Sequence, residues 1–127
     1  MAITNAHYAY DVAANTWATA AVLPLPVSSY AIAGDEANGA YYVTGGNTGP
    51  SAAAQVQAYN IATNTWSQLP QLNVFRAFHE AALIDGKLYV TGGINPAGVT
   101  LATEAYDFST RRWTVVADML RPRSNAT

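Results

Sequence analysis

Residues 10–17 read YDVAANTW, and this stretch decides the fold because it recurs twice more along the chain. Residues 59–66 read YNIATNTW and residues 106–113 read YDFSTRRW, so a tryptophan follows a tyrosine by seven positions in every copy. The copies begin 49 and 47 residues apart. A fixed period of this length indicates a repeat architecture, in which one structural unit of nearly fifty residues is used more than once.

A double glycine recurs in the same phase. Residues 42–46 and 89–93 both read YVTGG, and each first glycine lies 14 residues before the tyrosine of the following copy. A residue without Cβ allows a bulge or a close approach to a neighbouring sheet. We expect these glycines to serve the backbone and not to cradle a phosphate, because no helix pattern and no Gly-Lys-Ser/Thr ending follows them.

The segments between these markers read as short strands. Runs such as KLYVT at 87–91 are rich in β-branched and aromatic residues, which is typical of strands. Asn38-Gly39 and Asp85-Gly86 predict two-residue hairpins of type I′, which need a positive φ at both positions. The pairs Thr63-Asn64 and Ser109-Thr110 predict turns that hydrogen-bond their own backbone.

Each unit is therefore expected to hold four strands. Strand one covers 29–34 or 78–84, strand two ends at the double glycine, strand three ends near the tyrosine and strand four holds the tryptophan. With a leading half unit the total is about ten strands, and no segment predicts a helix.

This pattern resembles the kelch repeat, whose blade carries an Arg or His near its start, then a strand ending in Gly-Gly, then Tyr, then Trp. Residues 76–79 (RAFH), followed by the later glycine pair, tyrosine and tryptophan, match the repeat from end to end. Residues 28–66 match it less closely, with Val27 in the place of Arg76 and two extra residues in the turn at 35–38. The resemblance covers nearly the whole chain.

The resemblance implies an all-β fold, a partial β-propeller of kelch type with four-stranded antiparallel blades. Residues 1–22 are expected to form the C-terminal half of a blade, 23–69 and 70–118 to form complete blades, and 119–127 to start a further one. Two and a half blades cannot close a ring, since propellers use about four to eight. Exposed blade faces and strand edges favour association, so we expect either a fragment of a longer propeller or a unit that assembles with copies of itself.

Composition limits what the chain binds. Half of the 127 residues are apolar and 11% are charged, which is enough to build a core with little charged surface. Eight acids and six bases give a net charge of −2, so the chain lacks the basic field that captures nucleic acid. No stretch has the length of a membrane span and the first residues lack a signal-peptide pattern. We therefore expect neither nucleic acid nor a membrane as a partner, and the compartment stays open.

Groups that would carry chemistry are few. There is no cysteine, and His7 and His79 lack further ligands at metal-binding spacing, so we expect no metal, no cofactor and no catalytic residue. His79, next to Glu80, is either a base lining the propeller channel or a residue that packs between blades. We favour packing, because one imidazole without a partner does not establish base catalysis.

Arg76 and Arg123 occupy one phase of the repeat, each ten residues after a tryptophan. Arg76 either braces the fold through a carboxylate such as Glu104 or presents an anion contact at the surface. Repetition in phase points to architecture and favours the brace.

Any binding site is expected on one end of the propeller, where the loops at 47–52, 94–99, 23–28 and 69–76 meet. The residues proposed for binding on this loop face are Asn47, Asn73, Arg76, Asn95, Arg121 and Arg123. The residues expected to be structural are Tyr10, Trp17, Gly45, Gly46, Tyr59, Trp66, Gly92, Gly93, Tyr106 and Trp113.

The resemblance implies a binding scaffold for a protein, for other copies of the chain, or for a glycan. An alternative is part of a catalytic carbohydrate-active propeller, like a sugar isomerase or oxidase, with its active site mostly in further blades. The copper oxidase version requires a cysteine cross-linked to tyrosine, which this chain lacks. A third alternative is a structural repeat without a ligand. We favour binding over catalysis, because a catalytic role would require a cluster of His, Arg and Glu at the channel mouth, which would lie in further blades. Fold does not define function, so the class of partner stays open.

Overall fold

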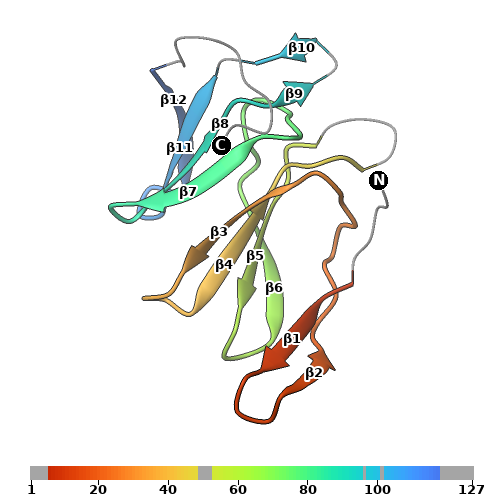
Figure 1. Cartoon of the computed structure of the whole chain (residues 1–127). Coiled ribbons are helices and arrows are strands. Elements are labelled where there is room, and N and C mark those ends of the chain that lie inside the picture. The colour runs from red at the N-terminus through yellow and green to blue at the C-terminus, as the bar shows by residue number, and fades with distance from the viewer. Residues whose placement is uncertain (1–5, 49–52, 96, 101, 118–127) are drawn as a thin grey trace.

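The computed structural model describes residues 6–48, 53–95, 97–100 and 102–117, and every regular element in these ranges is a strand (Figure 1). The described residues therefore form an all-β fold, as predicted, and contain no helix that would cross a membrane. The strands are β1 (Tyr8–Asp11), β2 (Thr16–Thr19), β3 (Ala31–Asp35), β4 (Ala40–Thr44), β5 (Val56–Asn60), β6 (Thr65–Leu69), β7 (Glu80–Ile84), β8 (Lys87–Thr91), β9 (Ile94–Asn95), β10 (Gly98–Val99), β11 (Thr103–Asp107) and β12 (Arg112–Val116).

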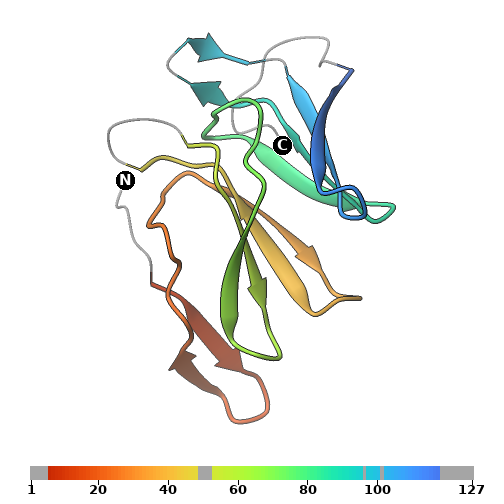
Figure 2. The same ribbon diagram turned by 180° about the vertical axis from the view of Figure 1, so that it is seen from behind.

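The strands form antiparallel sheets of consecutive hairpins. One four-stranded sheet has the order β3-β4-β5-β6, and a second has the order β7-β8-β11-β12. The hairpin β1-β2 precedes them, and the short pair β9-β10 lies in the loop between β8 and β11. Figures 1 and 2 show the hairpin and the two sheets following one another in chain order. The pair β9-β10 was not predicted, because each of its strands is only two residues long.

The inner strand of each four-stranded sheet begins two residues later than predicted. Ser29 and Phe78, at the same phase of the repeat, both have a φ of 56°, a left-handed conformation that no strand residue adopts. The bridges Ser28↔Asn47 and Ala77↔Ile94 hold the chain just before these residues. The N–H of Phe78 also donates to the carbonyl oxygen of Ser29 at 2.9 Å, so the two entry points touch.

The hairpin turns only partly follow the prediction. Asp85 and Gly86 have φ values of 50° and 76°, as a type I′ turn requires. The Asn38-Gly39 prediction was wrong, because β3 and β4 are separated by four residues and only Gly39 has a positive φ. Asp35 explains the difference, since its carboxylate accepts hydrogen bonds from both the backbone and the side chain of Asn38. These bonds, with one from Tyr42, lower the pKa of Asp35 against the opposing effect of burial.

The turns between tyrosine and tryptophan are also closed by a residue other than the predicted pair. Asn60 accepts from the N–H of Thr63 at 3.2 Å, and Asp107 accepts from the N–H of Ser109 at 2.9 Å. Both acceptors directly follow the tyrosine of the repeat. Short polar side chains of this kind favour turns because they replace a backbone acceptor.

The main core lies between the two four-stranded sheets. One face of β3–β6 contributes Ala33, Tyr42 and Val56, and the facing side of the next sheet contributes Leu88 and Tyr106. Leu88 and Tyr106 have no exposed surface. Alternation along each strand places these residues on one face, and β3 and β7 lie side by side. The sheets therefore stack face to face, as blades of a propeller do.

Candidate functional site

The loops at one end of the sheets form a connected surface, which we call the loop face. The bridges Ser28↔Asn47, Ala53↔Arg76 and Ala77↔Ile94 join the connections between sheets to the connections between second and third strands. The N–H of Ser28 donates to Asn47 and the N–H of Asn47 donates back to Ser28, at 3.0 and 2.6 Å. Backbone pairs of this kind make the loop face an extension of the sheets.

A pocket of about 370 Å³ opens on the loop face. Its size is within the range of small ligand pockets. Phe75 stands at its edge with 54% of its surface exposed. None of the described lining residues carries a charge, so they offer apolar surface with amide and hydroxyl groups. The lining residues are Leu25, Thr48, Ala53, Ala54, Gln55, Gln71 and Phe75.

Arg76, the residue after Phe75, lies inside the fold and not on the surface. Its Nη2 is 2.8 Å from Oε2 of Glu104, and neither side chain has any exposed surface. Its Nη1 donates to the carbonyl oxygens of Gly92 and Ala102 at 3.0 and 2.7 Å. The alternative in which Arg76 presents an anion contact at the surface therefore does not fit this structure. The buried guanidinium instead bonds Glu104 of β11 and the carbonyl oxygens that follow β8 and precede β11.

Glu104 holds the other end of the loop before Arg76 through hydrogen bonds to its backbone. Its two carboxylate oxygens accept from the N–H groups of Asn73 and Val74 at 2.7 and 3.1 Å. Burial lowers the pKa of Arg76, while the charge of Glu104 and its hydrogen bond oppose that change. The buried pair thus fixes the backbone that presents Phe75.

The asparagines proposed for binding contact the same loops. Asn73 is exposed, and its side chain lies 3.4 Å from the carbonyl oxygen of Trp113. Asn95 donates to the carbonyl oxygen of Phe75 at 3.0 Å and accepts from the N–H of Ala97. Asn47 pairs through its backbone as described above. These contacts support the loops; Arg121 and Arg123 lie outside the described residues.

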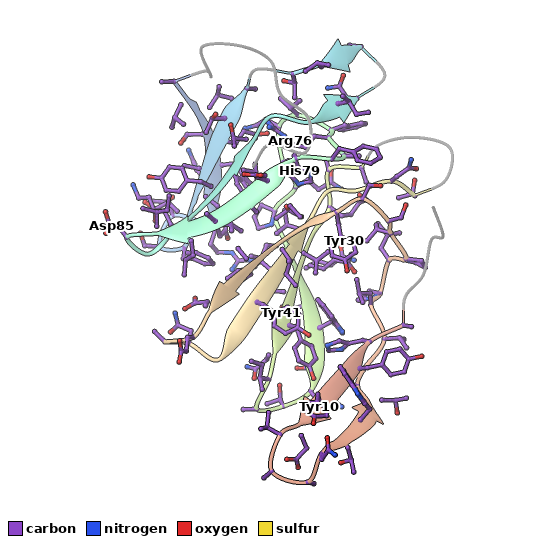
Figure 3. The ribbon with its side chains drawn as sticks, in the orientation of Figure 1. Tyr10, Tyr30, Tyr41, Arg76, His79 and Asp85 are labelled. Atoms are coloured by element: carbon purple, nitrogen blue, oxygen red, sulfur yellow. The ribbon has the colours of Figure 1, made fainter. Side chains whose placement is uncertain are left out.

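His79 is packed beneath the loop face, close to Arg76 (Figure 3). It is buried, and its Nε2 lies 2.8 Å from Oγ1 of Thr44. Burial, followed by the positive charge of Arg76, lowers the pKa of His79 to about 4. The imidazole is therefore neutral near pH 7 and lies between the blades, with no carboxylate among its hydrogen-bond partners in the described chain.

The glycine pairs leave room for this packing. A Cβ on Gly45 would lie 2.5 Å from the carbonyl oxygen of Arg76, and one on Gly93 would lie 2.6 Å from that of Ala77. Both glycines also have positive φ, 54° and 94°. Only glycine allows the end of strand two to touch an inner-strand entry at these positions. Gly45 touches the entry of the following blade, and Gly93 touches the entry of its own blade.

The tyrosine and tryptophan of each repeat form one recurrent contact. Their ring centroids lie 4.9, 4.9 and 5.2 Å apart in chain order. Trp66 donates its indole N–H to the carbonyl oxygen of Ala21, and Trp113 donates to that of Pro70, both at 2.8 Å. Trp113 is buried, Trp66 is half-buried and Trp17 is 71% exposed.

Sequence reasoning missed Phe75, Gln55 and Gln71 because they carry no periodic signal. Pro26 and Pro122 occupy the phase of Phe75 in the neighbouring repeats.

Sequence reasoning also left His7 unassigned. Its ring lies among Tyr41, Tyr59 and Trp66, and its Nδ1 contacts the carbonyl oxygen of Ala21 at 2.9 Å. Burial raises the pKa of Tyr41 to about 12.

The described residues contain no cluster of three or more His, Asp or Glu side chains that could hold a metal ion.

A family profile described as Kelch motif matches residues 38–73 and 76–120, which together make up more than half of the chain. The chain belongs to the kelch-repeat family.

The kelch assignment agrees with the match to a similar protein. The chain is 33% identical over 93 residues to Kelch-like protein 15 of Danio rerio, a match that covers 61% of this chain. The chain spans only 15% of the length of that relative. Protein binding is typical of kelch proteins, so the family supports a binding scaffold in general terms.

The kelch blades also resemble solved structures. A fungal alcohol oxidase of the AA5 family, in complex with copper, matches with a TM-score of 0.75 over 85% of this chain and 26% of that protein. The sequences are 18% identical. At this identity the likeness shows a shared propeller-type fold and carries no activity over.

Proposed function

We propose that these kelch blades are a scaffold that binds another protein through the loop face, with the pocket beside Phe75 as the anchor point. The observation that carries the proposal is the exposed Phe75 side chain on a backbone held by the buried Arg76–Glu104 pair. Exposed aromatic residues at fixed positions are typical of the residues that dominate protein interfaces. A rigid loop also reduces the entropy lost on binding.

The chemistry of the pocket indicates the kind of partner. Leu25 and Phe75 offer apolar contacts, and Gln55, Gln71 and Thr48 offer amide and hydroxyl groups. The lining residues that the structure describes have no charged side chain to pair with a charged group, which would lose its hydration on entry. We therefore expect the partner to insert an uncharged, partly apolar side chain from a loop or an extended segment.

The proposal is tested by selecting peptides from a random display library on the purified chain and measuring their affinity by titration calorimetry. Phe75→Ala is expected to weaken selected peptides at least about tenfold. Ile61→Ala removes an equally exposed apolar residue at the opposite end of the sheets and is the matched control, with unchanged affinity expected. Gln71→Lys should weaken the same peptides by placing a charge at the pocket.

Peptides that bind the Phe75→Ala and Gln71→Lys chains as well as the original would contradict the proposal. A glycan array run with the same variants distinguishes the alternative ligand class. Glycan binding that depends on Phe75, without peptide binding, would replace the protein partner by a carbohydrate.

A further inference from the structure

The pocket on the loop face is lined from two connections that have the same phase in the repeat. Leu25 belongs to the connection that enters the sheet β3-β4-β5-β6, and Phe75 belongs to the connection that enters the sheet β7-β8-β11-β12. Leu25 has the phase of Val74, the residue directly before Phe75. The two connections can therefore be compared position by position.

A buried side chain of the third strand holds each connection. Glu104 of β11 accepts hydrogen bonds from the N–H groups of Asn73 and Val74, as described above. Gln57 of β5 has the phase of Glu104. Its Oε1 accepts from the N–H of Leu25 at 3.0 Å, and its Nε2 donates to the carbonyl oxygen of Leu25 at 3.2 Å. Gln57 is 1% exposed, so its amide depends on these two bonds for its partners.

The residues around each connection explain why one is held by a carboxylate and the other by an amide. Pro24 has the phase of Asn73 and no N–H, so the second oxygen of a carboxylate would lack its donor there. Val27 has the phase of Arg76 and is buried, so a carboxylate would also lack a counter-charge. An amide carries one acceptor, one donor and no charge, which matches the N–H and the carbonyl group of Leu25.

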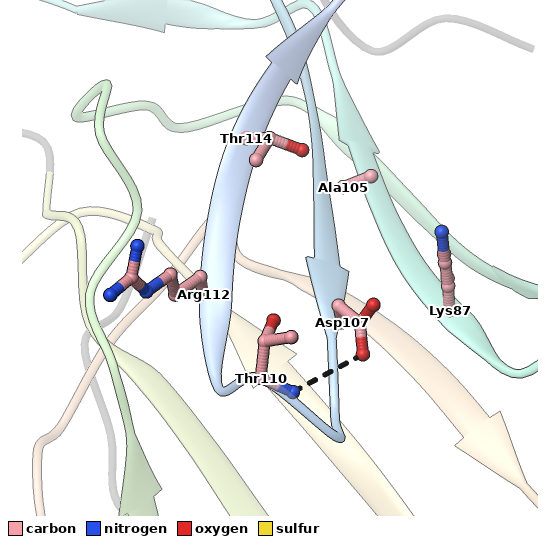
Figure 4. Close-up of a pocket in the computed structure, with 6 residues that line it drawn as sticks. All are labelled: Lys87, Ala105, Asp107, Thr110, Arg112 and Thr114. Carbon is pink, nitrogen blue, oxygen red and sulfur yellow. Dashed lines mark hydrogen bonds between the residues drawn. The ribbon is translucent and has the colours of Figure 1, made fainter.

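Arg76 is the buried cation that the carboxylate requires. The other Lys and Arg side chains that the structure describes, Lys87, Arg111 and Arg112, are exposed. Lys87 and Arg112 line a hollow of about 470 Å³ on the surface of the last sheet, where solvent reaches them (Figure 4). The two connections are thus held by two different sets of partners, one with a pair of opposite charges and one with no charge.

We infer that Gln57 is a positioning residue of the pocket on the loop face. It fixes the backbone of Leu25, and thereby the apolar side chain that Leu25 adds to the lining, as the neutral counterpart of Glu104. Gln57 is not among the described lining residues, so it acts through Leu25. Its effect on binding rests on the proposed function, whereas its hold on Leu25 is a property of the chain alone.

Amide hydrogen exchange, measured by nuclear magnetic resonance, tests the hold on Leu25. The N–H of Leu25 should exchange at least about tenfold faster in Gln57→Leu than in the original chain, because the change removes the acceptor and keeps a side chain of similar size. The N–H of Val74, held by Glu104, should keep its rate. Gln68→Leu makes the same change at an exposed position of β6 and should leave both rates as they are.

Transplanting the charged set tests whether the partners act as a unit. Gln57→Glu buries a carboxylate without a counter-charge, and Val27→Arg buries a guanidinium without one, so each alone should lower the urea midpoint of unfolding. The double variant should recover part of this loss, because the two charges can pair. Adding Pro24→Asn supplies the missing N–H and should recover more. Midpoints that fall additively would show that these positions are independent and would overturn the comparison with Glu104.

Peptides selected for binding that depends on Phe75 test the effect on the pocket. Gln57→Leu should weaken them by about three- to tenfold, and Gln68→Leu should not. In a Leu25→Ala chain Gln57→Leu should have almost no further effect, because the side chain through which Gln57 acts is gone. A loss of equal size with and without the Leu25 side chain would assign the effect to general loosening of the fold and would overturn the positioning role.

The outcomes separate this inference from the proposed function. A Leu25 N–H that exchanges equally fast in the original and Gln57→Leu chains would overturn the inference whatever the peptides do. Peptides that depend on Phe75 but bind the Gln57→Leu chain as tightly as the original would also overturn it and leave the proposed function standing. If no peptide depends on Phe75, the proposed function fails, and slow exchange at Leu25 that is lost in Gln57→Leu still supports the hold on the connection.

Discussion

Arg76 and Glu104 form an ion pair of 2.8 Å between two side chains without exposed surface, and this pair connects the loop face to the sheet beneath it. The carboxylate also holds the N–H groups of Asn73 and Val74. Burying both charges is costly unless each is paired, so the pair specifies the position of the loop more than it adds stability.

Removing one partner is therefore expected to be costly. Glu104→Ala leaves the Arg76 guanidinium buried without its counter-charge and should lower the free energy of unfolding by about 3–5 kcal/mol, as measured by urea denaturation. The double variant Arg76→Met with Glu104→Gln should recover part of this loss, because no charge remains buried. Glu36→Gln, at an exposed turn position, should change stability by less than about 0.5 kcal/mol. A Glu104→Ala chain as stable as the Glu36→Gln chain would contradict the structural role of the pair.

The glycine pairs give a second prediction. Gly45→Ala and Gly93→Ala place a Cβ within 2.5 and 2.6 Å of a backbone carbonyl oxygen at positive φ, so each should lower the free energy of unfolding by about 2–4 kcal/mol. Gly34→Ala is the control, because nothing lies within 4 Å of its Cβ and its φ is not positive. It should be neutral or stabilise by about 0.5–1 kcal/mol. Equal effects at the three sites would mean that no close approach occurs.

His79 predicts a pH dependence of stability. Its pKa falls from 6.5 to about 4 on folding, chiefly through burial. Between these pH values the unfolded chain therefore binds a proton at His79 and the folded chain does not. The contribution of His79 to the free energy of unfolding should therefore be fully present above pH 6.5. It should fall by about 3 kcal/mol as the pH drops towards about 4. Asp35 and Asp107, whose pKa values are lowered by hydrogen bonds, act only at lower pH. His79→Gln should flatten the slope between pH 6.5 and about 4 in urea titrations; an unchanged slope would assign it to other groups.

The tryptophans should differ in energetic weight although they share one motif. Trp113→Ala opens the core between the sheets and should cost about 3–5 kcal/mol, and Trp113→Phe, which leaves the Pro70 carbonyl without its donor, about 1–2 kcal/mol. Trp17→Ala should cost less than about 1 kcal/mol, because its ring is exposed. Guanidinium denaturation compares the three, and similar losses would contradict the assigned environments.

Much of the architecture could be predicted because the repeat carries it. The tyrosine, tryptophan and glycine positions recur in phase, and each recurrence corresponds to a sheet or to a contact between sheets. The start of β7 could not be predicted. Phe78 has a positive φ directly after the bridge Ala77↔Ile94, and its side chain gives no signal of that conformation. The Asn38-Gly39 hairpin was wrong because Asp35, at the end of the strand, reorganises the turn.

The candidate site was harder to predict for the same physical reason. Arg76 had two interpretations until its contact with Glu104 showed that it is buried, because sequence does not report burial for an arginine that can pair. Phe75 and the glutamines of the pocket vary between repeats, and positions without periodicity give no signal. The part of the kelch blade that differs from copy to copy is the part proposed to bind.

The stacking of equivalent blades is the central claim, and the indole hydrogen bonds test it most directly. Nuclear magnetic resonance on the chain with isotope-labelled tryptophan would measure which protons lie near each indole N–H. It would also measure how fast each indole proton exchanges with water. The structure predicts that the Trp66 indole lies near Ala21, that the Trp113 indole lies near Pro70, and that both exchange slowly. Indoles that exchange at the rate of free tryptophan, or that lie near residues outside the preceding blade, would contradict the stacking.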